Sequence, residues 1–519
     1  MTISMRAFLR AGTAWCFVVA LWASAARAFE TKSLKSALDS ISVAELRHHV
    51  EVLANDTFEG RAAGTRGGRA AAGYLAEQFK RYGLKPAGRG NNSYYQPFGA
   101  GFQNILGVLE GSDPALKHEY IIIGAHYDHV GYGTSRNSNG PVGYIHNGAD
   151  DNASGDATLL EVLEGLTKLD TPPKRSILFA LWDCEEADLN GSRHWLSDPT
   201  VPRERVVFAF NMDMVGRLAK KPLEIIGTRS AVGLRRFVAE HNDTAELPLD
   251  FTWELKRNSD HYSFYSYNIP ILFIHTGLHN DYHRPSDDAE KLNYDGMRSI
   301  ARLVFELVYW QAEADNRPKF RDASRGEGPG NQRSLEAPIA PAAGRLGIRW
   351  DDAPDGGPGL HLTQVYPGTA AARAGLRIDD RLLEFEGVAL DAQSDLRSLV
   401  LAAPAAVRVR VRSAGEESPR EIPVELDGKR VRLGISWHED AAEPGTLIVV
   451  HVIPSSRAER AGIRQADRIY RVNGEPFHGG AEFAEKVAKT TGSFNLTLER
   501  FGRLVTVEAP ESPHAAGQQ

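Results

Sequence analysis

The last third of this 519-residue chain repeats itself at an offset of 87 residues, and this repeat restricts the fold more than any other feature. The first copy spans about residues 344–428 and the second about 430–511. Such regular self-similarity predicts two copies of one small domain. The matching positions are Leu346-Gly347-Ile348 with Leu433-Gly434-Ile435, Pro367 with Pro454, Ala374-Gly375 with Ala461-Gly462, Asp380-Arg381 with Asp467-Arg468, and Gly387 with Gly474.

The part of the chain before the two repeats is expected to fold as a separate domain. A chain of 519 residues is too long for one hydrophobic core, and its length predicts about three domains. Residues 316–343 turn polar and rich in Pro, Gly and Arg, as in Gly326-Glu327-Gly328-Pro329-Gly330, which predicts a linker. Residues 29–315 therefore form the predicted first domain.

Short apolar runs alternate with helical periodicity through residues 29–315. Because strands that alternate with helices are buried on both faces, the pattern predicts an α/β fold, a three-layer sandwich around a mostly parallel mixed sheet. A glycine-rich loop is expected at 59–68. The expected strands lie at 120–124, 176–182, 206–211, 223–226 and 270–275, and the expected helices at 43–53, 70–82, 157–169 and 294–312.

The first 28 residues read as a signal peptide. Arg6 and Arg10 precede an apolar stretch from about Ala14 to Ala23, and Ala26-Arg27-Ala28 follows as a cleavage site. An uncut anchor begins in the same way, but this apolar run is short for a spanning helix. We expect a secreted or periplasmic product with no integral membrane segment after cleavage.

Charge and cysteine content exclude some classes of protein. The formal net charge is −7 and the sequence pI is about 6.2, which gives no reason to expect a nucleic acid partner. Of the two cysteines, Cys16 lies in the signal segment, so the mature chain keeps Cys184 alone. No internal disulfide is expected, and Cys184 is interpreted as a small core residue.

Each expected central strand ends in a cluster of polar residues, and ligands of open α/β sheets gather at that edge. His126 and Asp128 are two positions apart, so they point together; His126 suits a metal and Asp128 would accept its other ring proton. The cluster 183–186 contains adjacent acids on a loop, where neighbouring side chains point in different directions. One of them could bind metal while the other transfers a proton. The clusters are 124–129, 147–155, 183–186, 211–213 and 281–287.

The order His, Asp, Glu-Glu, Asp, His resembles the co-catalytic zinc exopeptidases, which include bacterial leucyl aminopeptidases and glutamate carboxypeptidase. The resemblance covers roughly residues 40–312 and includes Gly191-Ser192 and Ser259-Asp260-His261. It implies two Zn²⁺ ions, with Glu185 as general base and Tyr282 as oxyanion donor. The implied ligands are His126 and Asp213 on one zinc, Glu186 and His283 on the other, and Asp151 bridging both.

The sequence departs from the family at Asp188, where relatives usually carry glycine, and this leaves the local loop shape open. The resemblance implies a dizinc aminopeptidase that removes N-terminal residues from peptides, with a metal-bound hydroxide as nucleophile. A carboxypeptidase on the same site stays open, because no residue is identified that receives the substrate's ammonium or carboxylate. A one-metal glutaminyl-cyclase-like transferase fits the five-ligand set less well, and cobalt or manganese would fit the same ligands.

The two repeats resemble PDZ domains of bacterial envelope proteases. Leu346-Gly347-Ile348 and Leu433-Gly434-Ile435 stand where that family has its carboxylate-binding loop, which holds a protein or peptide C-terminus. The alternative is that these residues only begin a strand after a tight bend. From a different functional class, the chain could be a PDZ scaffold with an inert peptidase domain.

Overall fold

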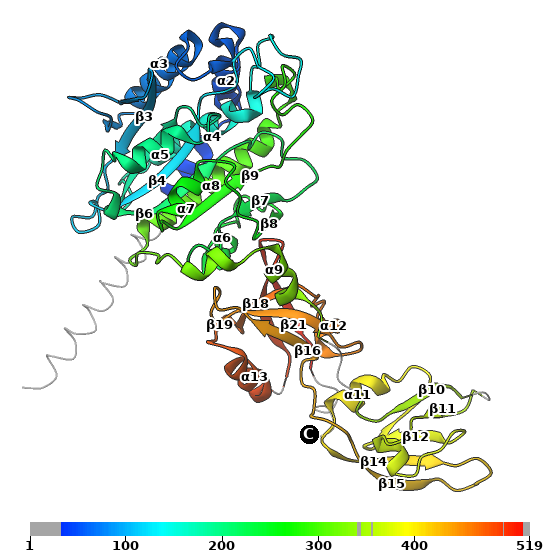
Figure 1. Ribbon diagram of the computed structural model, residues 1–519. Helices are drawn as coiled ribbons and strands as arrows, with labels where there is room; N and C mark the ends of the chain where they lie inside the picture. The colour runs from blue at the N-terminus through cyan, green and yellow to red at the C-terminus, as the bar shows by residue number, and fades with distance from the viewer. Residues whose placement is uncertain (1–32, 340–343, 354–355, 491, 512–519) are drawn as a thin grey trace, which may run out of the picture. The chain divides into compact units, whose positions relative to one another are not determined.

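The computed structural model describes residues 33–339, 344–353, 356–490 and 492–511 (Figure 1). The predicted signal peptide lies outside the described residues. The chain divides into two compact units, one that ends at Pro329 and takes in Phe501–Arg503, and one formed by the rest from Gly330 onward. Within the described residues, no helix combines the length and the apolar character needed to span a membrane.

One mixed sheet forms the centre of the first unit. Its strand order is β1-β3-β5-β4-β6-β9-β7-β8, with β2 beside β3. The pairs β5-β4, β4-β6 and β6-β9 are parallel, whereas β3 and β7 run antiparallel to their neighbours β5 and β9. The strands are β1 (Lys85–Pro86), β2 (Tyr95–Phe98), β3 (Phe102–Leu109), β4 (Tyr120–His126), β5 (Ser176–Trp182), β6 (Val206–Met212), β7 (Leu223–Ile226), β8 (Leu249–Asp250) and β9 (Ile271–His275).

Helices cover both faces of this sheet. Ile121 and Ile123 of β4 join a core with the helices α2, α4 and α8, while Ile122 joins a second core with α5 and α7 on the opposite face. These two cores confirm the predicted three-layer α/β sandwich (Figure 1). The helices are α2 (Val43–Leu53), α3 (Arg66–Arg81), α4 (Gly155–Thr167), α5 (Asn190–Ser197), α6 (Leu234–Glu240), α7 (His261–Ser266) and α8 (Tyr294–Glu313).

The segment expected as a loop at 59–68 is shorter than predicted. A 3-10 helix, η1 (Asp56–Arg61), occupies its start, and α3 already begins at Arg66, capped by the Thr65 hydroxyl. The glycines serve close packing here, because a Cβ on Gly67 would stand 1.9 Å from the Phe58 carbonyl oxygen. The glycine-rich run therefore includes the start of α3, where the absence of a side chain lets the helix pack closely against the backbone of η1.

The predicted linker at 316–343 also contains regular structure. It holds the 3-10 helix η5 (Asp322–Gly326) and the helix α9 (Pro329–Glu336). Glu327 pairs with Arg229 and Arg321 at 2.8 and 2.6 Å, which ties the start of this segment to the first unit. Charged residues of the predicted linker are therefore part of an ion-pair network.

The second unit holds two sheets of the same topology, as the internal repeat predicts. Their orders are β10-β11-β12-β14-β15, with β13 on β12, and β16-β17-β18-β20-β21, with β19 on β18, and each has its own core. The first copy contains β10 (Ile348–Asp352), β11 (Leu360–Val365), α10 (Ala370–Arg373), β12 (Arg381–Phe385), β13 (Val388–Ala389), α11 (Leu396–Ala402), β14 (Ala406–Arg412) and β15 (Arg420–Glu425). The second contains β16 (Ile435–Glu439), β17 (Leu447–Val452), α12 (Arg457–Arg460), β18 (Arg468–Val472), β19 (Glu475–Pro476), α13 (Gly480–Lys489), β20 (Phe494–Arg500) and β21 (Arg503–Ala509).

Candidate metal centre

Five segments of the first unit meet at the carboxyl ends of its parallel strands. His126 ends β4, Asp213 follows β6, and the loop after β5 carries Glu185 and Glu186. Asp151 comes from the irregular turn Ala149–Ser154 that precedes α4, and the loop after β9 carries His283. Because parallel strands end at the same edge, residues up to 157 positions apart in sequence lie together there.

Three of these side chains form the first donor group, here called the His126 group: His126, Asp151 and Asp213. The Nε2 atom of His126 lies 3.4 Å from Asp151 Oδ1 and 3.3 Å from Asp213 Oδ1. All three residues are buried, and their ligand atoms lie within 4.8 Å of one another. This is the spacing of donors around one cation.

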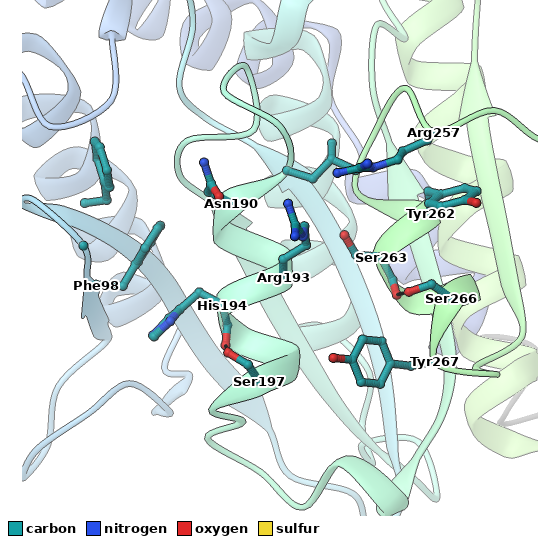
Figure 2. A pocket seen from close by; sticks show the side chains of 13 residues that line it. Phe98, Asn190, Arg193, His194, Ser197, Arg257, Tyr262, Ser263, Ser266 and Tyr267 are labelled. Atoms are coloured by element: carbon teal, nitrogen blue, oxygen red, sulfur yellow. Dashed lines mark hydrogen bonds between the residues drawn. The ribbon is translucent and has the colours of Figure 1, made fainter.

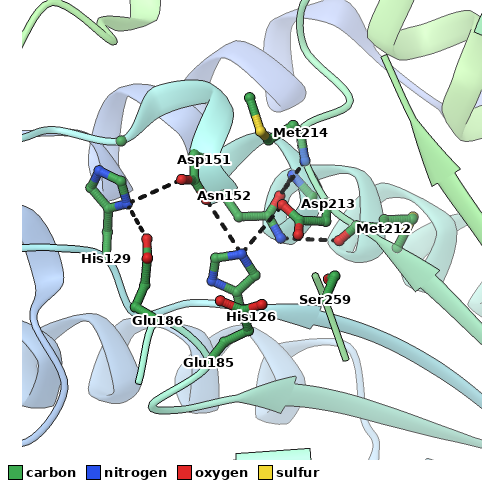
Figure 3. A network of polar contacts seen from close by, with 12 residues as sticks. His126, His129, Asp151, Asn152, Glu185, Glu186, Met212, Asp213, Met214 and Ser259 are labelled. Atoms are coloured by element: carbon green, nitrogen blue, oxygen red, sulfur yellow. Dashed lines mark hydrogen bonds and ion pairs between the residues drawn. The ribbon is translucent and has the colours of Figure 1, made fainter. Parts of the chain in front are cut away.

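Four side chains form the second donor group, here called the His283 group: His129, Asp151, Glu186 and His283. The Nε2 atom of His283 lies 3.1 Å from Asp151 Oδ2 and 3.1 Å from Glu186 Oε2. Asp151 thus faces one group with Oδ1 and the other with Oδ2 (Figure 3). The structure brings all five predicted ligands together and adds His129, which the sequence analysis did not select.

The chemistry of both groups fits divalent cations. They offer imidazole nitrogens and carboxylate oxygens, which zinc and its neighbours accept. Among the described residues, Asp151 Oδ2 and His283 Nε2 are buried without a hydrogen-bond partner, although they face each other. Burial opposes the change, but Asp151 and Glu186 raise the pKa of His283 to about 10, so the pocket strongly favours positive charge.

Asp128 supports the centre in a different way from the one predicted. Its carboxylate accepts hydrogen bonds from the backbone N–H groups of Glu185, at 2.9 Å, and Glu186, at 3.3 Å. The Nδ1 atom of His126 instead contacts the backbone carbonyl of Asp128 at 3.1 Å, while the carboxylate is 3.8 Å away. The prediction that the carboxylate accepts the ring proton was therefore wrong, because that carboxylate already holds the loop of the two glutamates.

Glu185 and Tyr282, the predicted base and oxyanion donor, are the direct neighbours in sequence of Glu186 and His283 of the His283 group. Burial raises the pKa of Glu185 well above its usual value, and the nearby acids Asp260, Asp213 and Glu186 raise it further, although His126 opposes them. The Tyr282 ring stacks on His283, with centroids 3.9 Å apart. Burial and the surrounding carboxylates raise the pKa of Tyr282, so its hydroxyl stays protonated and able to donate.

Arg61, which the sequence analysis did not select, connects two of the segments that carry the donor residues. Arg61 is fully buried and donates to the carbonyls of Leu53, Tyr127, Asn147 and Gly148 at 2.6 to 2.9 Å. It thereby joins the end of β4 to the turn that carries Asp151. The only feature of the sequence that could have drawn attention to Arg61 is its position in the glycine-rich run at 59–68.

Asp150 and Asp287 hold the Asp151 turn from the other side. Asp287 Oδ2 accepts the backbone N–H groups of Asp150 and Asp151, at 2.9 and 3.0 Å. Asp150 Oδ1 accepts the Gly216 N–H, and its Oδ2 lies 3.1 Å from His279 Nε2. Asp150 is thus occupied with the backbone and His279 and lies outside both donor groups, as the sequence analysis expected.

Ser259, Cys184 and Asp188, which the sequence analysis also named, lie outside both donor groups. Ser259 accepts a hydrogen bond from Asn211 at 2.8 Å, and the His261 ring stacks on Phe273, so the two form no catalytic pair. Burial raises the pKa of the Cys184 thiol to about 12, which keeps it unreactive. Asp188 takes the left-handed conformation expected of glycine, with φ 77°, and pairs with Arg193 and Arg257 at 2.7 and 2.6 Å.

A cavity of about 800 Å³ lies apart from the two donor groups, along α5 and α7 (Figure 2). Aromatic and basic side chains dominate its wall, and the donor residues are not among those that line it. The lining residues are Phe98, Gly99, Phe102, Leu189, Asn190, Arg193, His194, Ser197, Arg257, Tyr262, Ser263, Ser266 and Tyr267.

The predicted carboxylate-binding loops of the second unit are tight bends before β10 and β16. Gly347 and Gly434 have φ of 80° and 96°, and a Cβ on either would collide with Thr369 or Ser456. In the first copy, the loop 344–348 and Trp350 line a groove together with Arg397, Val400 and Leu401 of α11. Leu346 and Leu433 are buried in their cores, so within these loops only Ile348 and Ile435 have partly exposed side chains.

The fold and the paired donor groups define a class of protein, metal-dependent α/β enzymes. Residues 104–308 match the model of peptidase family M28, and residues 361–413 and 421–499 match models of the PDZ domain. The chain therefore carries an M28 peptidase domain followed by two PDZ domains.

Two curated relatives match different shares of the chain. The chain is 31% identical over 189 residues to the Na(+)/H(+) exchange regulatory cofactor NHE-RF1 of Gallus gallus, covering 28% of this chain and 56% of that protein. It is 26% identical over 304 residues to leucine aminopeptidase 1 of Phaeosphaeria nodorum, covering 55% of this chain and 74% of that protein. The chain thus spans only about half the length of the first of these relatives.

A solved structure, the Legionella pneumophila LapA aminopeptidase, is 21% identical with a TM-score of 0.46, covering 55% of this chain and 76% of that one.

Proposed function

We propose that the chain is an exported two-metal aminopeptidase that removes N-terminal residues from peptides, with PDZ domains that bind peptide or protein C-termini. One observation carries the proposal: Asp151 is shared between the His126 group and the His283 group, one oxygen to each. A carboxylate in that position suits a pair of neighbouring cations. We assign two zinc ions to it, because imidazole and carboxylate are ordinary zinc donors.

When bound, a pair of divalent ions lowers the pKa of an attacking water and polarises the scissile carbonyl. The chain's own residues perform the proton transfers. Glu185 is held beside the centre by the hydrogen bond from its N–H to Asp128, and its raised pKa suits it to take the water's proton and pass it to the leaving amine. The protonated Tyr282 hydroxyl donates to the oxyanion that develops on the carbonyl oxygen.

Aminopeptidase activity is favoured by the relatives named leucine aminopeptidase. A carboxypeptidase would use the same donors and the same base. The groove beside Trp350 and the bend at Gly347 support peptide binding by the first PDZ domain. The signal segment at residues 1–28 supports export.

The test is release of free amino acids from matched peptides whose N-termini are free or acetylated. The assay is run on the full chain with a chelator and again after zinc is restored. Trimming of free N-termini alone, lost on chelation and regained with zinc, is the expected result. Cleavage of acetylated peptides from the C-terminus would make the domain a carboxypeptidase. No cleavage by protein that holds two metals would favour the PDZ scaffold.

A further inference from the structure

We propose that His129 is a direct ligand of the metal in the His283 group, in addition to the predicted Asp151, Glu186 and His283. The proposal rests on the two-metal centre proposed above, and it concerns how that centre holds its ions. His129 lies three residues past His126, just beyond the end of β4, where side chains no longer alternate as in a strand. For that reason a strand pattern does not predict its direction.

The position of the ring supports a ligand role. His129 Nδ1 lies 2.9 Å from Glu186 Oε1 and 3.6 Å from Asp151 Oδ2, and the four donor atoms of the group lie within 4.8 Å of one another. The His129 and His283 rings are nearly perpendicular, at 80°, with centroids 5.5 Å apart. Two imidazoles and two carboxylates therefore place their ligand atoms around one point. Figure 3 shows His129 directed toward Asp151 and Glu186.

The chain also fixes this ring in place. His129 is 1% exposed, and its ring lies against Gly148, where an added Cβ would stand 2.5 Å from His129 Cδ2. Gly148 has φ 57° and directly precedes the turn that carries Asp151. A side chain at position 148 would push His129 out of the donor group.

A competing role is a hydrogen bond alone, in which His129 Nδ1–H donates to Glu186 Oε1. The two roles differ in what can replace the imidazole. If His129 is a metal ligand, an aspartate at this position can replace it, because Asp Oδ and His Nδ1 both lie two bonds beyond Cβ and the anionic oxygen also binds zinc. A hydrogen-bond donor tolerates Asn, whose amide donates, but not Asp, which would repel Glu186.

The ligand role makes the two ions unequal. The metal of the His283 group would have four protein ligands, whereas the metal of the His126 group would have three. The His283 group should therefore bind the first zinc more tightly, and the ion in the His126 group should keep more positions for water and substrate.

The experiment measures zinc content and zinc affinity of the full chain by competition with a chromophoric chelator, for the wild type, H129A, H129N and H129D. We expect one of the two zinc affinities to fall about 10- to 100-fold in H129A and H129N, and to stay within a few-fold of wild type in H129D. His49→Ala removes a buried histidine of α2 that is hydrogen-bonded to Tyr74 of α3, and it should leave both affinities unchanged. Wild-type affinity in H129N with a loss in H129D, or no change in any variant, would overturn the proposal.

A spectroscopic variant makes the test independent of affinity. In H129C loaded with cobalt, a ligand sulfur adds a sulfur-to-cobalt charge-transfer band that the wild type lacks, because the native Cys184 lies outside both donor groups. H129C that binds two cobalt ions without this band would contradict a ligand role. Both measurements report metal binding and not turnover. A failure of the proposed peptidase activity would appear only in the peptide-release assay and would leave this test of His129 unaffected.

Discussion

Asp128 accepts a hydrogen bond from the backbone N–H of Glu185 at 2.9 Å. This bond joins the end of β4, which carries His126, to the loop after β5, which carries the proposed base and a proposed ligand. The second oxygen of Asp128 accepts the Glu186 N–H, so one buried carboxylate sets the position of both glutamates.

Asp128→Asn should reduce turnover while the domain stays folded. Asparagine offers one oxygen where aspartate offers two, and its amide would face a backbone N–H. We expect kcat/KM on an amino-acyl reporter to fall about 10- to 100-fold. Asp113→Asn is the matched control, because Asp113 also accepts two backbone N–H groups, those of Ala115 and Leu116, in a distant loop. Equal activity in both variants would show that the Asp128 bonds do not position the base.

Glu185→Gln should separate metal binding from proton transfer. The amide keeps the size of the side chain but cannot take a proton from water, so kcat should fall about 10²- to 10⁴-fold with two metals still bound. Glu186→Gln is the contrasting variant, since Glu186 belongs to a donor group and its loss should lower metal content. Full turnover by metal-loaded Glu185→Gln would remove Glu185 from the mechanism.

Tyr282→Phe should lower kcat without lowering metal content. It removes one donor to the developing oxyanion, which costs about 10²- to 10³-fold in comparable sites. Tyr94→Phe serves as control, because that hydroxyl donates to the Leu84 carbonyl away from the centre. If Tyr282→Phe raises only KM, the hydroxyl binds substrate and does not stabilise the oxyanion.

Glu161 should make the stability of the first unit depend on pH. Burial raises its pKa to about 8 from 4.5, and Glu45 and Glu164 add to this, although the Ser42 N–H opposes them. The folded state therefore binds this proton more tightly than the unfolded state. The stabilising contribution is complete below about pH 4.5 and is lost as the pH rises to 8.

Glu161→Gln should remove this dependence, since its amide oxygen still accepts the Ser42 N–H. At pH 9 the variant should be more stable than the wild type by on the order of 2 kcal/mol, and at pH 5 the two should be similar. Thermal unfolding across this range measures the difference. Glu77→Gln, on the exposed side of α3, should show no such trend. A wild-type advantage that grows with pH would refute the assignment.

The sequence predicted the central sheet well because buried parallel strands have a simple signature. The runs at 176–182 and 223–226 are strands β5 and β7 with those bounds, and the other expected strands differ by two residues or fewer. Strand ends placed the polar clusters at one edge of the sheet, and the resemblance to the zinc exopeptidases then implied the individual residues from His126 to His283.

The supporting contacts could not be predicted in the same way. Arg61 acts through backbone carbonyls, which carry no residue signature. His129 lies beyond the end of β4, where strand alternation no longer predicts the direction of a side chain. The Asp128 carboxylate was assigned to His126 because strand alternation pointed there, whereas the loop after β5 provides better-placed donors. Loop conformation set by tertiary packing decides each of these contacts.

The most direct test of the two-metal centre is the amount of zinc bound per chain, measured by elemental analysis, in the wild type and in Asp151→Ala. Asp151 is the one residue shared by both donor groups, so its loss should weaken both sites. The account predicts two zinc ions per wild-type chain and the loss of tight binding at both sites in Asp151→Ala. A wild-type chain that binds a single zinc, or an Asp151→Ala variant that keeps two, would contradict it.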